Sequence, residues 1–301
     1  MTESIAVVVV TFNRADLLSE MLAALGEQTR RPDAVYVVNN ASEDHTKDVL
    51  KAAQETGLPL HITHSPDNLG GAGGFHLGMR TAYEAGHDRI WLMDDDVLPA
   101  QDCLETLLDQ QQPFVTAVRE DRHGTLIEKA ATHFDLRNPL ALKPKRSAVE
   151  DEYATREQMP ERVALHNVAF EGPLIHRDVI AAIGLPDPSY FIFYDDADFA
   201  IRARRAGFRI WAIRDAVLRR QLDFNQQHDL AGWKGYYMYR NLFVVHFRYG
   251  ENALVRAKPY LIAIAVTLLS PLRGGRKEAG NVLRALRSAR SMRQVPGASV
   301  D

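Results

Sequence analysis

The feature that most constrains the fold is an alternation of apolar, β-branched runs with helically spaced segments in the N-terminal third of the chain. Residues 5–11, 34–38, 60–63 and 90–93 have strand character, and apolar residues three or four positions apart, such as Leu18, Met21 and Leu22, lie between them. This alternation predicts an α/β fold, with a mostly parallel sheet and helices on both faces. Ligands of such sheets bind at the carboxyl ends of the strands, so we look for site residues there.

The rest of the chain predicts further elements. Residues 163–176 and 208–214 have strand character, 196–206 are expected to be helical, and 236–247 form an aromatic-rich helix. Residues 134–162 are polar and poorly periodic, so we expect a surface excursion there, with a mobile loop over the site as one possibility.

Composition sets few further limits. The single cysteine, Cys103, excludes an internal disulfide framework and an all-cysteine metal site, and it suits a reducing compartment. The N-terminal apolar run has no basic region before it, which favours a buried strand over a signal peptide. Residues 251–301 carry nine Lys and Arg against three Asp and Glu, although the whole chain has a net charge of −3. This asymmetry predicts a basic tail that meets an anionic surface.

The tail also has an apolar component. Residues 260–269 are apolar apart from Thr267, but this run is too short to span a bilayer, which needs roughly 20 residues. The next stretch reads as a basic amphipathic helix, with Arg284, Arg287 and Arg290 among Val282, Leu283 and Leu286. Such a helix can lie in a membrane interface. The alternative is a helix packed on the catalytic domain with a solvated basic face.

The strongest chemical signal is the triplet Asp94-Asp95-Asp96, directly after an apolar strand. Adjacent carboxylates repel one another and become favourable when a hard divalent cation such as Mg²⁺ or Mn²⁺ neutralises them. An acidic turn without a ligand is the alternative. We interpret the triplet as a metal site because it ends a strand of the buried type.

A second acidic cluster, Asp195, Asp196 and Asp198, follows an aromatic run. Carboxylates in the first turn of a helix are favoured by the helix dipole, which is one explanation. The other is a general base that deprotonates an acceptor hydroxyl. An ion pair between Asp198 and Arg202, four residues on, would support the helix locally.

Three weaker signals remain. The glycine-rich residues 68–74 precede a helix and could let backbone amides approach a phosphate. Trp233 and Tyr236 could stack on sugar rings or simply be buried in a helix face. His228 could be a third metal ligand, although it could equally be a surface histidine.

The segments VVVTFNR, VVNNASEDHT, NLGGAGGFHLGM, WLMDDDV and FYDDADFAIRARRAG occur in this order. Over roughly residues 5–245 they resemble the family 2 glycosyltransferases, and they look most like the actinobacterial galactofuranosyltransferases that initiate cell-wall galactan. The resemblance implies a GT-A fold for residues 1–250, followed by the basic helical segment 251–301, which we expect to associate with membrane. It implies an inverting enzyme that uses Mn²⁺ or Mg²⁺, with UDP-galactofuranose as donor. The implied acceptor is a polyprenyl-diphosphate-linked GlcNAc-rhamnose. We therefore expect a peripheral protein at the cytoplasmic face of the plasma membrane, with no nucleic-acid partner.

The family's site residues carry over by position. The residues expected to bind the nucleotide sugar are Thr11, Asn13, Arg14, Asn40, Asp44, Asn68, Gly70, Asp94 and Asp95. Asp94 and Asp96 match the metal carboxylates, and Asp196 matches the catalytic base, with Asp195 beside it. For acceptor binding we assign Glu171, Gly172, Tyr194, Trp233 and Tyr236.

The chain departs from the family pattern at one place. Related galactofuranosyltransferases have a histidine metal ligand in the stretch that matches residues 216–220, which contains no histidine here. Either His228 replaces it, or Arg219 or Arg220 neutralises the leaving diphosphate.

Three other functions remain as alternatives. A rhamnosyltransferase using dTDP-rhamnose would share the early motifs. A sugar nucleotidyltransferase would need a glycine-rich triphosphate loop near the N-terminus, and FNRADLL lacks those glycines. A non-catalytic, membrane-bound binding module would not need the second acidic cluster.

Overall fold

A mixed β-sheet forms the centre of the molecule in the part that the computed structural model describes, residues 3–141, 143–222, 230–270 and 276–294. The strand order is β3-β2-β1-β4-β10-β6-β11-β5, with β9 paired to β11. Its parallel half consists of β1 (Ile5–Thr11), β2 (Ala34–Asn39), β3 (Leu60–His64) and β4 (Arg89–Asp94). These are the four N-terminal strands that the sequence predicted.

The other half of the sheet mixes strand directions. In it, β6 (Phe114–Glu120) and β11 (Ile210–Arg220) are parallel, and β10 (Pro173–His176) lies antiparallel between β4 and β6. Two further strands, β5 (Val97–Pro99) and β9 (Arg162–Leu165), pair antiparallel with β11. The strand character expected over residues 163–176 is found at the two ends of that segment, because residues 166–172 cross between β9 and β10.

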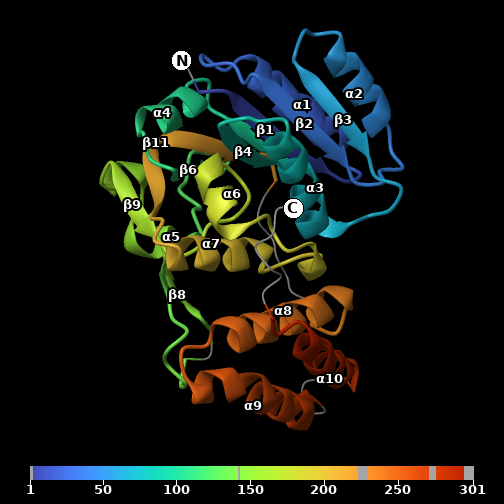
Figure 1. The fold of residues 1–301 in the computed structure, drawn as a ribbon, viewed down its shortest axis with the longest axis vertical. Coiled ribbons are helices and arrows are strands. Elements are labelled where there is room, and N and C mark those ends of the chain that lie inside the picture. Colours follow the sequence, from blue (N-terminus) through green and yellow to red (C-terminus); the bar gives the residue numbers. More distant parts are fainter. Residues whose placement is uncertain (1–2, 142, 223–229, 271–275, 295–301) are drawn as a thin grey trace.

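Helices cover both faces of this sheet, as the alternation predicted (Figure 1). On one face lie α1 (Ala15–Gly26), α2 (Thr46–Gln54) and α4 (Cys103–Asp109). On the other lie α3 (Gly70–Glu84), α6 (Arg177–Ile183) and α7 (Asp195–Arg205). Every residue of β1 is buried, since its alternate side chains enter two different hydrophobic clusters. The mostly parallel α/β fold with flanking helices is thus confirmed.

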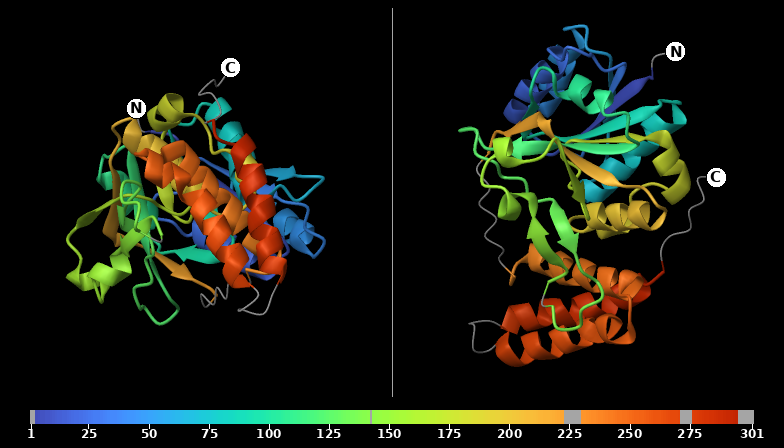
Figure 2. Two further views of the ribbon diagram at one scale, coloured as in Figure 1. Left: turned by 90° about the horizontal axis from the view of Figure 1, so that it is seen from below. Right: turned by 90° about the vertical axis from the view of Figure 1, so that its left-hand side faces the viewer.

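The predicted surface excursion forms a hairpin and two short helical turns. They are β7 (Ala131–Phe134), β8 (Lys145–Ala148), α5 (Val149–Glu152) and the 3₁₀ turn η1 (Arg156–Gln158). The hairpin extends away from the sheet to the C-terminal helices (Figure 2). There the amide of Glu251 donates to the Leu136 carbonyl at 3.0 Å. A second 3₁₀ turn, η2 (Pro188–Tyr190), precedes α7.

The last three helices form a separate layer below the sheet domain (Figure 1). They are α8 (Trp233–Tyr249), α9 (Ala253–Leu269) and α10 (Arg276–Ser291), which share one hydrophobic cluster. Val282, Ala285 and Ala289 bury the apolar face of α10 in this cluster, so that face is not available to a membrane. The expected division at residue 250 falls between α8 and α9. Among the described residues no helix is long and apolar enough to cross a bilayer.

Candidate active site

The sheet brings the predicted strand-end residues together. Thr11 at the end of β1 is in register with Asn39 at the end of β2, and Val10 is in register with Asp94 of β4. Three neighbouring strands therefore end at one edge, as parallel pairing requires. Thr11 is buried there, with its hydroxyl beside the Asp95 carboxylate.

The acidic triplet at this edge is only partly neutralised by the protein. Arg14 Nη1 lies 3.0 Å from Asp95 Oδ1 and 3.0 Å from Asp96 Oδ2. Burial, followed by the charges of Glu171 and Asp96, raises the pKa of the Asp94 carboxyl well above its usual value. The other carboxylate oxygen of Asp96, Oδ1, is buried without a hydrogen-bond partner among the described residues. The edge thus has an excess of negative charge.

The glycine-rich segment begins α3 beside the triplet and is held by Asn40. The Asn40 side chain accepts a hydrogen bond from the Leu69 amide at 2.8 Å and donates to Asn68 Oδ1 and the Gly70 carbonyl, each at 3.1 Å. Gly70 has a φ of +70°, and a Cβ there would lie 2.1 Å from the carbonyl oxygen of Phe191. Only glycine allows this close approach. The Asn40 side chain thus stabilises the conformation of the glycine-rich loop.

Asn13 and Asp44 also have local structural partners. Asn13 Oδ1 accepts from the Glu43 amide at 2.8 Å, and its own amide donates to Ser42 Oγ at 3.0 Å. Asp44 accepts from the Ala15 amide at 3.0 Å, which joins the second strand exit to the first turn of α1. The structure brings both residues to the strand-end edge, and their nucleotide-binding roles stay predictions.

Glu171 lies between the two acidic clusters. Arg119 Nη1 contacts its Oε2 at 2.8 Å, and Arg220 Nη2 contacts its Oε1 at 2.7 Å. Burial alone would raise the pKa of the Glu171 carboxyl, but these two guanidiniums outweigh burial and lower the pKa to about 2. After burial, Glu171 is the largest influence that raises the pKa of Asp94, and it also contributes to that of Asp196. Glu171 therefore links the two acidic clusters electrostatically.

Asp195 and Asp196 begin α7, at the other side of Glu171. Burial, with the charge of Asp196 added, raises the pKa of the Asp195 carboxyl to about 8. Burial raises the pKa of Asp196 to about 6, although its Oδ1 accepts a hydrogen bond from the Ala197 amide at 2.6 Å. Burial raises both pKa values, and that of Asp195 is raised further, so Asp196 gives up its proton more readily. Of the two, Asp196 is the one able to accept a proton.

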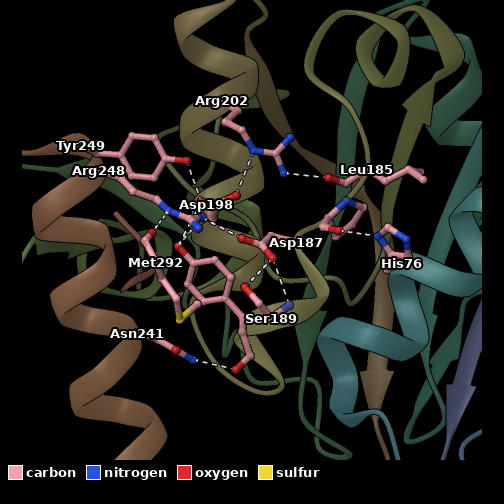
Figure 3. Close-up of polar contacts among 12 residues, drawn as sticks. His76, Leu185, Asp187, Ser189, Asp198, Arg202, Asn241, Arg248, Tyr249 and Met292 are labelled. Carbon is pink, nitrogen blue, oxygen red and sulfur yellow. Dashed lines mark hydrogen bonds and ion pairs between the residues drawn. The ribbon is translucent and has the colours of Figure 1, made fainter. Parts of the chain in front are cut away.

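Asp198, the third residue of this cluster, belongs to the interior (Figure 3). It accepts hydrogen bonds from Arg202 Nε at 2.9 Å, Arg248 Nη1 at 3.1 Å and the Tyr249 hydroxyl at 2.6 Å. The predicted Asp198–Arg202 pair is confirmed, and Arg248 also contacts Asp187 at 2.9 Å. This buried network fastens α7 to α8.

The segment before α7 is held in an unusual backbone conformation. Phe191, Phe193 and Tyr194 all have positive φ, at 62°, 69° and 66°. Non-glycine residues rarely adopt this region, so neighbouring contacts must maintain it. Asn241 of α8 supplies them: its Nδ2 lies 2.7 Å from the Ile192 carbonyl and 2.9 Å from the Phe193 carbonyl. Burial raises the pKa of Tyr194, the N-terminal neighbour of α7, to about 12.

The aromatic residues at the start of α8 divide into two groups. Trp233 is 58% exposed and stands beside the stacked pair of Phe191 and Tyr237, whose ring centroids are 4.9 Å apart. Tyr236 is only partly exposed and packs against the cluster shared by the last three helices. Trp233 is thus open to a ligand, and the acceptor roles of Trp233 and Tyr236 stay predictions.

Three predicted residues remain to be placed, and the structure also shows site residues that the sequence did not predict. Gly172 follows Glu171 at the start of β10, where its carbonyl accepts from the Trp91 indole at 3.0 Å. Arg219 is exposed on β11, and His228 lies outside the described residues. The sequence interpretation missed Arg119 and Glu128, a buried ion pair at 2.6 Å that supports Glu171. The available signal was a charged pair, Arg119-Glu120, that ends an otherwise apolar strand.

The fold and its strand-end acidic site define a glycosyltransferase of the GT-A type. The solved structure titled "GalNAc-T7 with UDP, GalNAc and Mn2+" has the same fold, with a TM-score of 0.65 at 12% identity over 94% of this chain. This chain spans 54% of that protein's length. The chain belongs to glycosyltransferase family 2, because the model described as "Glycosyltransferase like family 2" matches residues 3–236.

Two curated relatives place the chain within that family. It is 37% identical to galactofuranosyltransferase GlfT1 of Mycobacterium tuberculosis over 221 residues, which cover 72% of this chain and 70% of the relative. It is 22% identical to dTDP-rhamnosyl transferase RfbF of Shigella flexneri, over 71% of this chain and 68% of that relative. The chain is therefore a family 2 member of the galactofuranosyltransferase-like kind.

Proposed function

We propose that this protein transfers galactofuranose from UDP-galactofuranose to a polyprenyl-diphosphate-linked acceptor that carries GlcNAc and rhamnose. The observation that carries the proposal is a second acidic cluster: Asp196 lies in the first turn of α7, and Glu171 raises the pKa of both Asp196 and Asp94, at the end of β4. A base on one side and a leaving-group site on the other are what a displacement at a sugar carbon requires. The stronger similarity to GlfT1 than to RfbF supports galactofuranose over rhamnose.

The edge at β4 fits a divalent cation. The buried, unpartnered Oδ1 of Asp96 and the raised pKa of Asp94, due first to burial, both indicate carboxylates that a cation would stabilise. Within the described ranges no three His, Cys, Asp or Glu side chains are grouped so as to hold a metal ion. We propose that Asp94 and Asp96 would hold Mn²⁺ or Mg²⁺ beside the donor diphosphate. When bound, the ion supplies charge stabilisation of the UDP leaving group.

The reaction is a single displacement. The acceptor hydroxyl oxygen forms a bond to the anomeric carbon of galactofuranose from the face opposite UDP. The carbon–oxygen bond to UDP breaks with its electron pair on the diphosphate, and the hydroxyl proton passes to the Asp196 carboxylate. The anomeric configuration inverts. We assign Arg14 to meet the diphosphate, because its side chain is 43% exposed although it pairs with Asp95, whereas Arg220, held by Glu171, is only 11% exposed.

Calorimetric titration of donors tests the nucleotide preference. With Mn²⁺ present, UDP-galactofuranose should bind at least tenfold more tightly than dTDP-rhamnose, and Asp94→Asn should weaken the binding of both UDP and Mn²⁺. Tighter binding of dTDP-rhamnose would replace the galactofuranose proposal with the rhamnosyltransferase alternative. Equal UDP affinity with and without metal would remove Asp94 and Asp96 from the metal site.

A further inference from the structure

The end of the molecule opposite the sheet domain carries a row of exposed apolar side chains on α9. Leu254, Leu261, Ile264 and Leu268 are 65%, 63%, 58% and 71% exposed. Their spacing of seven, three and four residues places them along one face of the helix. The opposite face of α9 is buried through Val255 and Ala263. An exposed apolar row of this kind is typical of a surface that meets a partner.

The β7–β8 hairpin adds a further exposed leucine at the same end. Leu140, near the hairpin tip, is 87% exposed. The tip is fastened to the beginning of α9, because Lys258 Nζ donates to the Asn138 carbonyl at 3.2 Å and Asn252 Nδ2 to the Arg137 carbonyl at 2.7 Å. Two views of the ribbon show the hairpin descending to this helix (Figure 1, Figure 2). We call the exposed apolar residues of α9 together with Leu140 the apolar end surface.

The exposed charges around the apolar end surface are basic with one exception. In the described parts of residues 135–146 and 251–294, every exposed charged side chain except Glu251 is basic. These side chains are Arg137, Lys143, Arg146, Arg256, Arg276, Lys277, Arg284, Arg287, Arg290 and Arg293. The acidic residue of α10, Glu278, is buried and accepts a hydrogen bond from the Tyr239 hydroxyl at 2.6 Å. The surface therefore combines an apolar row with a basic surround.

We propose that the apolar end surface docks on an anionic lipid bilayer, with the leucines of α9 and Leu140 entering the interface. Basic side chains beside an apolar helix face match an anionic headgroup layer above hydrocarbon. A second copy of this chain, placed symmetrically on the same surface, would bring these basic side chains against one another. The contact is peripheral, since no described helix can span the membrane. It is made by α9 and the hairpin, whereas α10 buries Val282, Ala285 and Ala289 and exposes Leu283.

Docking at this surface fixes how the active site faces the membrane. α8 packs on α9 and also holds the segment before α7 through Asn241. The ion pairs of Arg248, on α8, with Asp187 and Asp198 also join α8 to α7 and to the segment before it. The bilayer contact is thus tied to the helix that begins with Asp195 and Asp196. Docking thus holds the active site at a fixed distance from the bilayer. This distance sets where the sugar of a lipid-linked acceptor meets the site, a consequence that depends on the proposed function.

Flotation with lipid vesicles tests the proposal without reference to the reaction. Full-length protein is mixed with vesicles of phosphatidylcholine alone or of phosphatidylcholine with phosphatidylglycerol, an anionic lipid. Wild type should float with the anionic vesicles. Leu261→Gln with Leu268→Gln should reduce the partition coefficient about a hundredfold, since burying each leucine is worth roughly a factor of ten. Leu140→Gln should give a smaller reduction. Leu222→Gln, an exposed leucine at the end of β11, is the matched control and should float like wild type.

The enzymatic readout separates this proposal from the proposed function. The α9 double variant should keep its rate on a water-soluble acceptor and lose rate on the same sugar anchored in vesicles. Loss of galactofuranosyl transfer in every form would refute the function and leave the flotation result intact. Wild type that fails to float, or a double variant that floats equally well, would overturn the lipid proposal. So would a dimer that the double variant dissociates in sedimentation velocity without any vesicle binding.

Discussion

Replacing Asp196 by asparagine should lower kcat about a thousandfold, or roughly 4 kcal/mol of transition-state stabilisation. General-base catalysis typically contributes a factor of about a hundred to ten thousand, and the pKa of Asp196, about 6, makes it the member of the pair that gives up its proton more readily. Asparagine has nearly the same shape but cannot accept the proton. The affinity for UDP and metal should remain within about twofold, since the nucleotide edge is formed by other residues.

The matched control is Asp195→Asn, one residue earlier on the same helix. Because the pKa of Asp195 is raised to about 8, its side chain is already mostly neutral at pH 7. Asparagine resembles that neutral state, so kcat should stay within about threefold of wild type. The pair of variants thus separates loss of a base from general damage to the first turn of α7.

The pH profile of the wild-type enzyme tests the assignment of Asp196 as the base in a second way. With a pKa of about 6 in the free enzyme, the ionised fraction of Asp196 falls from about nine-tenths at pH 7 to about one-tenth at pH 5, so wild-type kcat/KM should fall roughly tenfold. The assay is initial-rate radiolabel transfer at subsaturating donor and acceptor. If Asp196→Asn kept more than a tenth of wild-type kcat, or if Asp195→Asn were the inactive variant, the assignment of the base would be wrong.

Three further predictions concern other parts of the molecule. Asp195→Asn should raise the melting temperature at pH 8 more than at pH 5. The native carboxyl holds its proton up to about pH 8 and the unfolded one only to about pH 4, so wild type loses stability as the pH rises between these values. An equal shift of the melting temperature at both pH values would contradict this. Arg248→Met should cost about 3–5 kcal/mol in urea unfolding, because it leaves the buried carboxylates of Asp187 and Asp198 without their shared cation, and a loss below 1 kcal/mol would refute that reading. Arg14→Gln should tighten nucleotide-free Mn²⁺ binding by about fivefold in calorimetry, since the half-exposed guanidinium competes for Asp95 and Asp96, and weaker binding would exclude competition.

Local patterns in the sequence were sufficient for the strand-end edge of the site. Parallel strands must end side by side, so the apolar runs predicted that the strand ends at Thr11 and Asp94 would meet. The helix after the second acidic cluster and its Asp198–Arg202 pair were also predictable, because both depend on residues within one or two turns.

The environment of Glu171 could not be predicted in this way. Its partners Arg119 and Arg220 come from β6 and β11, and only the completed sheet places these strands next to each other. The same limit applies to Arg14, whose contact with Asp95 and Asp96 joins residues that are about eighty positions apart.

The C-terminal segment shows a different limit. Its helices were recognisable from apolar spacing, but spacing does not tell which apolar face meets protein and which meets solvent. In the structure α10 buries Val282 and Ala285, and α9 instead leaves Leu261 and Leu268 exposed. Packing against α8 determines which face of each helix is buried.

The most direct test of the account is transfer from UDP-galactofuranose to a short lipid-linked rhamnosyl-GlcNAc acceptor, with and without Mn²⁺, with the product analysed by mass spectrometry and NMR. The account predicts a metal-dependent product that carries one or more galactofuranosyl residues with the anomeric configuration inverted. Absence of product from UDP-galactofuranose, together with product from dTDP-rhamnose, would contradict it. Product of retained configuration would contradict the single displacement with Asp196 as base.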